Sequence, residues 1–213
     1  MTGLKGLEYF EKLNSLSIGG YNKTAVDLTK SDVESVLFVD YAAKSISLNA
    51  PNVKRINFSI ANEKGQKLEK VDLSKCNKAK YIHAFCGDKY VTVKLPSSGK
   101  ALLSLTLRYL KDSTLNLNKY TNLLEFSVLV SKTSTIKADK CKSLRYAYFY
   151  CDDNLRSVNL SRCKNLKALD VYSCNRMKAA NVKTVKGCKK TDGKGSWWWG
   201  TEDYKNKVSA KVF

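Results

Sequence analysis

The single histidine and the seven cysteines are the side chains of this sequence best suited to covalent chemistry. His83 is followed three residues later by Cys86, and a cysteine–histidine pair acts as a nucleophile only when the side chains meet. On a strand, residues three apart point to opposite faces, so we expect this pair to stay apart. The chain has no phosphate-binding loop, zinc-protease motif, serine-hydrolase motif or calcium loop. The sequence therefore predicts a protein that is not an enzyme, with no catalytic residues and no cofactor.

The cysteines lack the arrangement of a metal site. Their number is odd and the chain has no C-x-x-C pair, which disfavours a zinc cluster. Cys76, Cys141 and Cys163 share one local sequence context, and Cys86 and Cys151 share another. Equivalent side chains in stacked strands point the same way, which strains a disulfide. We therefore expect no metal and mostly reduced, buried thiols that fill turn corners.

The elements that position these residues follow from a repeat. Eight segments have the pattern apolar-x-x-apolar-x-apolar, and their middle anchors are separated by steps of 20, 20, 26, 23, 21, 21 and 22 residues. A near-constant period of this size is the signature of a solenoid, in which each repeat is one coil of a stack. The anchors are Leu16, Val36, Ile56, Ile82, Leu105, Phe126, Ala147 and Leu169.

A second apolar-x-apolar pattern lies between consecutive anchors, and alternation of this kind is typical of strands with one buried face. A coil of roughly 21 residues with two such pieces leaves no room for a long helix. We expect a right-handed, mostly β solenoid with a parallel sheet on its concave side and short strands or single helical turns on its convex side. The second pattern begins at Val26, Ile46, Val71, Val93, Leu115, Ile136 and Val158, with a weaker copy at Val182.

One unit carries a family resemblance. The stretch from Leu155 to Asn175, with Leu155, Val158, Leu160, Leu166, Leu169 and Val171 at its apolar positions, resembles leucine-rich repeats. The similarity is to the short two-strand type of bacterial secreted and surface proteins, and residues 4–13 look like the entry into such an array. The resemblance covers about residues 4–188. It implies a binding module that is secreted or lies at the cell surface, although residues 1–5 show no apolar signal core. We expect a segment whose natural leader is missing.

Two departures from regularity predict further features. The steps of 26 and 23 residues indicate inserted loop residues near 61–67 and 86–90. After residue 188 the repeat pattern stops, and Trp197, Trp198 and Trp199 follow. The open end of a solenoid exposes apolar core and needs a cap. We therefore expect an array of about eight coils over 1–188 and a C-terminal cap over 189–213. The alternative is that the tryptophans form an exposed ligand site.

Residues that alternate with the buried anchors must face the open, concave side of the inner sheet. In the later repeats these positions carry tyrosines, and tyrosine and arginine are enriched in binding hot spots. We predict recognition of a protein, or alternatively a glycan, through this face. The competing interpretation is that tyrosine is simply a good strand former that half-buries its ring. The predicted site residues are Tyr81, His83, Phe85, Arg108, Tyr146, Tyr148, Tyr150, Asp170 and Tyr172.

The strongly basic charge allows more than one interpretation. The chain has 38 basic and 19 acidic residues, a net charge of +19, and 32 of the basic residues are lysines spread through nearly every repeat. A solvated surface is one explanation, and a surface that binds an anionic glycan or wall polymer is the other. A purely structural spacer is the third possibility. The scarcity of arginine argues against specific nucleic-acid binding. No apolar run approaches the ~20 residues of a membrane span. We expect a monomer.

Overall fold

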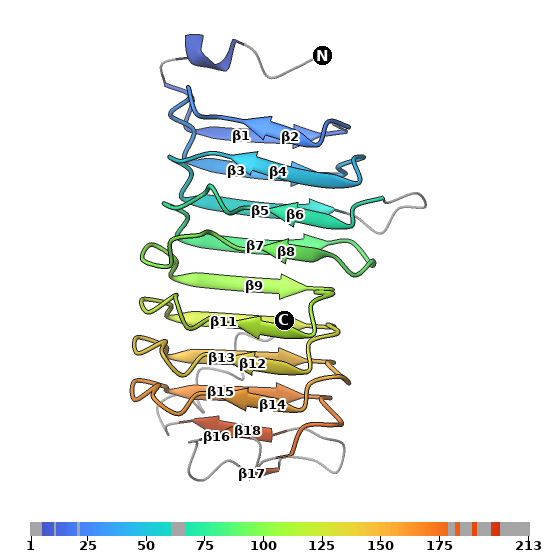
Figure 1. Ribbon diagram of the computed structural model, residues 1–213, viewed down its shortest axis with the longest axis vertical. Coiled ribbons are helices and arrows are strands. Elements are labelled where there is room, and N and C mark those ends of the chain that lie inside the picture. Colours follow the sequence, from blue (N-terminus) through green and yellow to red (C-terminus); the bar gives the residue numbers. More distant parts are fainter. Residues whose placement is uncertain are drawn as a thin grey trace.

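Each repeat folds into one coil that contains an inner and an outer strand, and the coils stack along a single axis (Figure 1). The computed structural model describes residues 6–10, 12–20, 22–60, 67–178, 182–183, 189–190 and 197–200. A short 3-10 helix, η1 (Leu7–Tyr9), precedes the stack. The inner strands are β1 (Ser15–Gly19), β3 (Ser35–Val39), β5 (Arg55–Ile60), β7 (Tyr81–Cys86), β9 (Ser104–Arg108), β11 (Glu125–Leu129), β13 (Tyr146–Tyr150) and β15 (Ala168–Tyr172).

The inner strands form one long sheet in the order β1-β3-β5-β7-β9-β11-β13-β15-β18-β17. Neighbours from β1 to β15 are parallel, and their register aligns all eight predicted anchors, from Leu16 with Val36 to Ala147 with Leu169. Because side chains alternate along a strand, the same register also aligns the exposed residues between the anchors into columns. The right-handed parallel solenoid predicted from the repeat is confirmed.

The outer strands form two separate sheets of four strands. Val26 pairs with Leu48 rather than with Ile46, so the first outer pair is shifted by two residues from the alignment that the sequence suggested. A shift of two keeps the same face buried, which explains why the hydrophobic pattern tolerates it. The strands are β2 (Ala25–Asp27), β4 (Ser45–Asn49), β6 (Lys70–Asp72) and β8 (Thr92–Lys94), then β10 (Thr114–Asn116), β12 (Thr135–Lys137), β14 (Ser157–Asn159) and β16 (Val182–Lys183).

The break between the outer sheets falls between β8 and β10, where a side chain replaces part of the backbone ladder. The Val93 N–H donates to Asp112 Oδ2 at 3.4 Å instead of to a carbonyl of the next strand. Further round the same coil, the Tyr120 hydroxyl donates to the Pro96 carbonyl at 2.9 Å. The inner sheet continues past this level without interruption.

Apolar side chains of both strands meet in a narrow core that runs the length of the stack. Register neighbours stack directly, as Phe38 and Phe58 do with ring centroids 4.7 Å apart and planes 8° apart. Phe126 and Phe149 pack edge to face at 5.5 Å. Each added coil therefore buries its apolar face against the coil before it, which is the source of stability in repeat proteins.

The turn from inner to outer strand, here called the first turn, begins with a left-handed residue in most coils. Positive φ angles occur at Gly20, Asp40, Tyr109, Val130, Cys151 and Ser173, each directly after its inner strand. In the fourth coil β7 is one residue longer, and Gly87 takes the left-handed conformation with φ 70°. The longer strand accommodates one of the two extra residues predicted near 86–90. The other lies in the second turn of this coil, residues 95–103, so its predicted place was wrong. The insertion predicted near 61–67 falls largely outside the described residues.

A buried carboxyl links the first turns of two later coils. Asp152 is fully buried, and its side chain accepts hydrogen bonds from the Ser131 hydroxyl and from the Asn154 N–H, the latter at 3.2 Å. Asn154 Nδ2 in turn donates to the Ser131 carbonyl at 3.1 Å. Burial raises the pKa of Asp152 to about 6, although these hydrogen bonds oppose the rise.

The turn from outer to inner strand, here called the second turn, is stabilised by side chains of two kinds. Asp or Asn at the end of the outer strand accepts from the N–H two residues later, as in Asp72 with Ser74 at 2.9 Å and Asn159 with Ser161 at 3.1 Å. Cys141 and Cys163 donate their S–H groups to carbonyls of the preceding coil, both at 3.2 Å. In these coils a short polar or thiol side chain therefore stabilises the second turn.

Among the described cysteines all six are free thiols, and the expectation that they are buried holds for five. Burial raises the pKa of Cys76, Cys86, Cys141, Cys163 and Cys174 to about 12. Cys151 is exposed, so its grouping with Cys86 as a buried corner residue was wrong. Cys86 still belongs to its extended strand, whereas Cys151 lies in the left-handed turn with φ 51° and points outward.

At the far end of the stack the chain reverses direction. β18 (Trp197–Gly200) pairs antiparallel with β15, and β17 (Lys189–Lys190) pairs antiparallel with β18. Backbone pairing of this kind covers the edge of the last coil. The tryptophan side chains, residue 188 and residues 201–213 lie outside what the structure describes, so the cap and its boundary stay predictions.

Candidate binding surfaces

The nine predicted site residues all lie on the solvent side of the long sheet. The strand register aligns these residues in three columns. The residues nevertheless form two clusters, because Arg108 is the only one of them on β9 or β11, the strands between β7 and β13. Three strand spacings separate β7 from β13, or about 14 Å. The first cluster is Tyr81, His83, Phe85 and Arg108, and the second cluster is Tyr146, Tyr148, Tyr150, Asp170 and Tyr172.

The second cluster contains a hydrogen bond to a carboxylate and a contact between two aromatic rings. The Tyr150 hydroxyl donates to Asp170 Oδ2 at 3.1 Å, and the Tyr150 ring lies 5.9 Å from the ring of Tyr172 at a tilt of 38°. Burial raises the pKa of Asp170, while the hydrogen bond from Tyr150 opposes that change. Tyr172 is 50% exposed, which makes it one of the few large apolar side chains on the described surface. This cluster therefore offers aromatic area with one fixed acceptor.

The first cluster is built around cations that lie over aromatic rings. The Arg55 guanidinium lies 4.6 Å from the centroid of Tyr81, and that of Arg108 lies 5.0 Å from the centroid of Tyr109. Nε of Arg108 is buried without a hydrogen-bond partner. His83 is exposed whereas Cys86 is buried, so the two side chains occupy opposite faces of β7, as their spacing predicted.

One column joins the two clusters. Phe85, Arg108, Leu129, Tyr150 and Tyr172 pair in sequence across five neighbouring strands. We call this column the aromatic row. Leu129 was not among the predicted site residues, because its neighbours on β11 are small or polar and gave no signal. Its position after the last anchor of the repeat was the available clue.

A further aromatic group beside the row was missed entirely. Tyr90 and Tyr109 meet edge to face at 5.8 Å, and Lys132 Nζ lies 4.6 Å from the Tyr90 centroid. These residues belong to first turns, where side chains do not alternate. Sequence alternation therefore could not place them on the sheet face.

The described part of the chain contains no group of three or more histidine, cysteine or acidic side chains placed to hold a metal ion. In that same part, no helix has the length and apolar character that crossing a membrane requires.

A stack of parallel coils that presents its exposed residues in registered columns defines a repeat protein of the β-solenoid class. Comparison with models of known protein families found no match, and neither did a search of curated proteins.

Proposed function

We propose that the protein is a non-enzymatic recognition module that binds a protein partner through the aromatic row and the second cluster. The observation that carries this proposal is the row itself, in which five large side chains stand in register on five neighbouring strands. The corresponding positions of β1, in the first coil, carry the small residues Ser15, Ser17 and Gly19 instead.

Physical properties of the row support a protein partner. Tyrosine and arginine bring large contact area at low entropic cost and dominate binding hot spots. Tyr150 is half-buried and held by Asp170, so part of the surface is ordered before any partner arrives. Preorganisation of this kind lowers the entropic cost of association.

The resemblance of residues 155–175 to short leucine-rich repeats supports membership of that repeat type and a secreted or cell-surface location. Both are part of this proposal.

The test compares substitutions in the second cluster, one of them also in the aromatic row, with a matched exposed aromatic residue elsewhere. Tyr148→Ser/Tyr172→Ser, Tyr9→Ser and the wild-type chain are immobilised, and proteins captured from extracts and medium of the source cells are quantified by mass spectrometry. Tyr9 is the control because it is 83% exposed and lies in η1, away from the long sheet. A captured protein is then purified, and its affinity for each variant is measured by calorimetry.

The proposal expects saturable binding that the control retains and that the double variant loses by about 30-fold or more, as for removal of a hot-spot residue. Equal affinity for all three chains would contradict it. So would a large drop in melting temperature of the double variant, since that would make these tyrosines structural.

A further inference from the structure

The second turns of the later coils gather basic charge on one long edge of the stack. In the five second turns between β6 and β15, spanning 73–80, 95–103, 117–124, 138–145 and 160–167, eleven residues are basic and only Asp139 is acidic. The five first turns on the opposite edge, spanning 87–91, 109–113, 130–134, 151–156 and 173–178, carry six basic and four acidic residues. We call the first set the basic edge: Lys75, Lys78, Lys80, Lys100, Lys119, Lys140, Lys142, Arg145, Arg162, Lys164 and Lys167.

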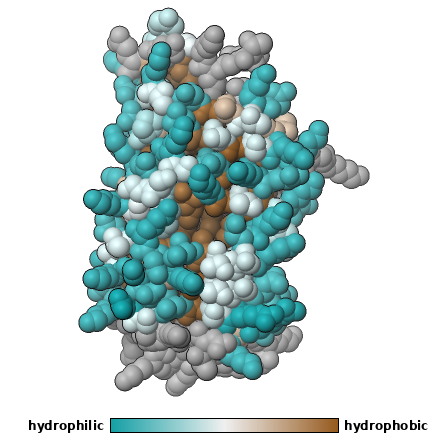
Figure 2. Space-filling view, viewed as in Figure 1, coloured by the Kyte–Doolittle hydropathy of each residue, from teal (hydrophilic) through white to brown (hydrophobic). Residues whose placement is uncertain are grey.

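Stacking creates this edge from lysines that are scattered along the sequence. Lys75, Lys119, Lys140 and Arg162 each lie two residues after the apolar residue that directly follows an outer strand. Equivalent positions in adjacent coils are separated by one strand spacing, about 4.8 Å. All eleven side chains are exposed. Hydrophilic residues protrude along the left side of Figure 2, where the second turns of Figure 1 project.

The backbone beneath the basic edge is ordered. The N–H of Arg145 donates to the Leu124 carbonyl and that of Lys167 donates to the Arg145 carbonyl, both at 2.7 Å. Asn side chains tie the turns together as well, since Asn122 and Asn165 each donate to a carbonyl of the preceding coil at 2.9 Å. The charges are therefore carried on a fixed frame with a regular spacing.

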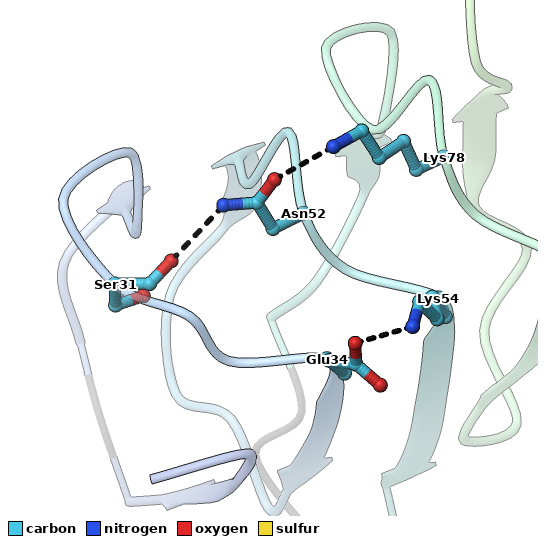
Figure 3. Close-up of polar contacts among 5 residues, drawn as sticks. All are labelled: Ser31, Glu34, Asn52, Lys54 and Lys78. Atoms are coloured by element: carbon cyan, nitrogen blue, oxygen red, sulfur yellow. Dashed lines mark hydrogen bonds and ion pairs between the residues drawn. The ribbon is translucent and has the colours of Figure 1, made fainter. Parts of the chain in front are cut away.

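The ion pairs of the described residues lie outside the basic edge rather than within it. In the second and third coils Glu34 forms an ion pair with Lys54, and Lys78 donates to Asn52 at 3.0 Å (Figure 3). The other ion pairs of the described residues, Lys44–Glu69 and Lys94–Asp72, lie elsewhere. None of these three pairs includes a residue of the basic edge. Lys75 interacts with the Asp27 carboxylate at longer range.

We propose that the basic edge binds a linear acidic polysaccharide laid along the stack, with its anionic groups facing successive coils. A row of like charges is unfavourable in the free protein and is relieved by a polyanion with repeating charge. Nine of the eleven residues are lysines, whose hydrated ammonium groups suit loosely held anions better than bidentate recognition.

Two other polyanionic partners, single-stranded nucleic acid and an anionic membrane, fit this edge less well. Single-stranded nucleic acid is held by bases that stack on aromatic side chains. The exposed large aromatic residues in the described structure are Tyr9, Phe10 and Tyr172, and none lies on this edge. An anionic membrane surface would require apolar side chains to insert beside the lysines, and Leu103 and Leu124 are only half-exposed.

The experiment measures binding of fluorescent polygalacturonate oligomers of increasing length by anisotropy, at several salt concentrations. The chains are the wild type, Lys75→Gln/Lys119→Gln/Lys140→Gln, and Lys23→Gln/Lys111→Gln/Lys178→Gln as a control with the same change in net charge. Oligothymidylate with the same number of charges and phosphatidylserine vesicles are the competing ligands.

We expect affinity to rise with oligomer length until the oligomer spans the five coils, to fall steeply with salt, and to drop about tenfold or more in the edge variant alone. Equal losses in the edge and control variants, or affinity independent of length, would overturn the proposal. Tighter binding of oligothymidylate or of the vesicles would also overturn it. The substituted lysines lie outside the aromatic row, so this outcome is independent of protein recognition by the long sheet.

Discussion

Gly99 lies directly against the backbone of Lys119 in the next coil. A Cβ built on Gly99 would stand 2.0 Å from the Lys119 carbonyl oxygen and 2.5 Å from its carbonyl carbon. Here the second turns of two coils approach so closely that no residue with a Cβ fits at position 99 without a shift of the backbone. The close approach coincides with the hydrogen bond from Tyr120 to Pro96.

Gly99→Ala is therefore expected to destabilise the fold by about 2–3 kcal/mol, because the new methyl group meets backbone atoms that cannot move aside independently. The free energy of unfolding in urea measures this. Gly19→Ala is the matched control, since its Cβ would meet Val39 at an ordinary 3.6 Å. Similar stability of the two variants would show that the turns separate easily.

Val130 is a β-branched residue in a left-handed conformation, with φ 47°. Such a conformation costs about 1–2 kcal/mol for a residue with a Cβ. Val130→Gly should therefore raise the free energy of unfolding by about 1 kcal/mol, despite the entropy that glycine loses on folding. Val39→Gly, at a half-buried position within β3, should lower it. Calorimetric melting of the two variants measures these changes. A loss of stability in both variants would contradict the claim that the Val130 backbone is strained.

The thiols should differ sharply in reactivity. Cys151 is exposed, whereas Cys76, Cys86, Cys141, Cys163 and Cys174 are buried with pKa values of about 12. Only the thiolate attacks an alkylating reagent. Among the described cysteines, brief treatment with N-ethylmaleimide at pH 7.5 should modify Cys151 alone, as peptide mapping would show. Modification of Cys141 or Cys163 in the folded protein at a comparable rate would contradict the packing.

Asp152 should make stability depend on pH near neutrality. Its pKa is about 6 in the folded protein, above the ordinary aspartate value of 3.8. The folded state therefore binds the proton more tightly. The stabilising contribution is complete below pH 4 and is lost as the pH rises through 6. The total change is about 3 kcal/mol.

Asp152→Asn keeps an acceptor for Asn154 and supplies a donor to Ser131, without a charge to bury. We expect the variant to lose this pH dependence and to be more stable than the wild type at pH 7.5. Urea unfolding at pH 5, 6 and 7.5 measures the effect, and Asp153→Asn at the exposed neighbour is the control. An unchanged pH profile in Asp152→Asn would assign the dependence to another group.

Alternation predicted the inner sheet because each inner strand buries one face, and a register error of one residue would expose its anchors. That is why Tyr148 and Asp170 were correctly placed in one column. The outer strands are shorter, and a shift of two residues costs little there, so the partner of Val26 was misassigned. Turn conformation was least predictable: nothing in the identity of Val130 or Tyr109 signals a left-handed residue.

The candidate surfaces were predictable to different degrees. The tyrosine positions followed from alternation, but their separation into two clusters follows from Ser104, Thr106 and Glu125 on the strands between them. The basic edge was hidden, because Lys75, Lys119 and Lys140 are far apart in sequence. Only when the period is applied to every turn position does their common edge emerge.

Between the two outer sheets, side chains make part of the contact that continuous main-chain ladders make elsewhere in the stack. Elsewhere both faces of neighbouring coils are linked by main-chain ladders, which tolerate most substitutions. Between β8 and β10 that ladder is reduced to the single bridge between Val91 and Leu110, and the side chains of Asp112 and Tyr120 supply further contacts. Bending of the stack will concentrate at this level. A change at either residue would loosen one half against the other while leaving each half folded.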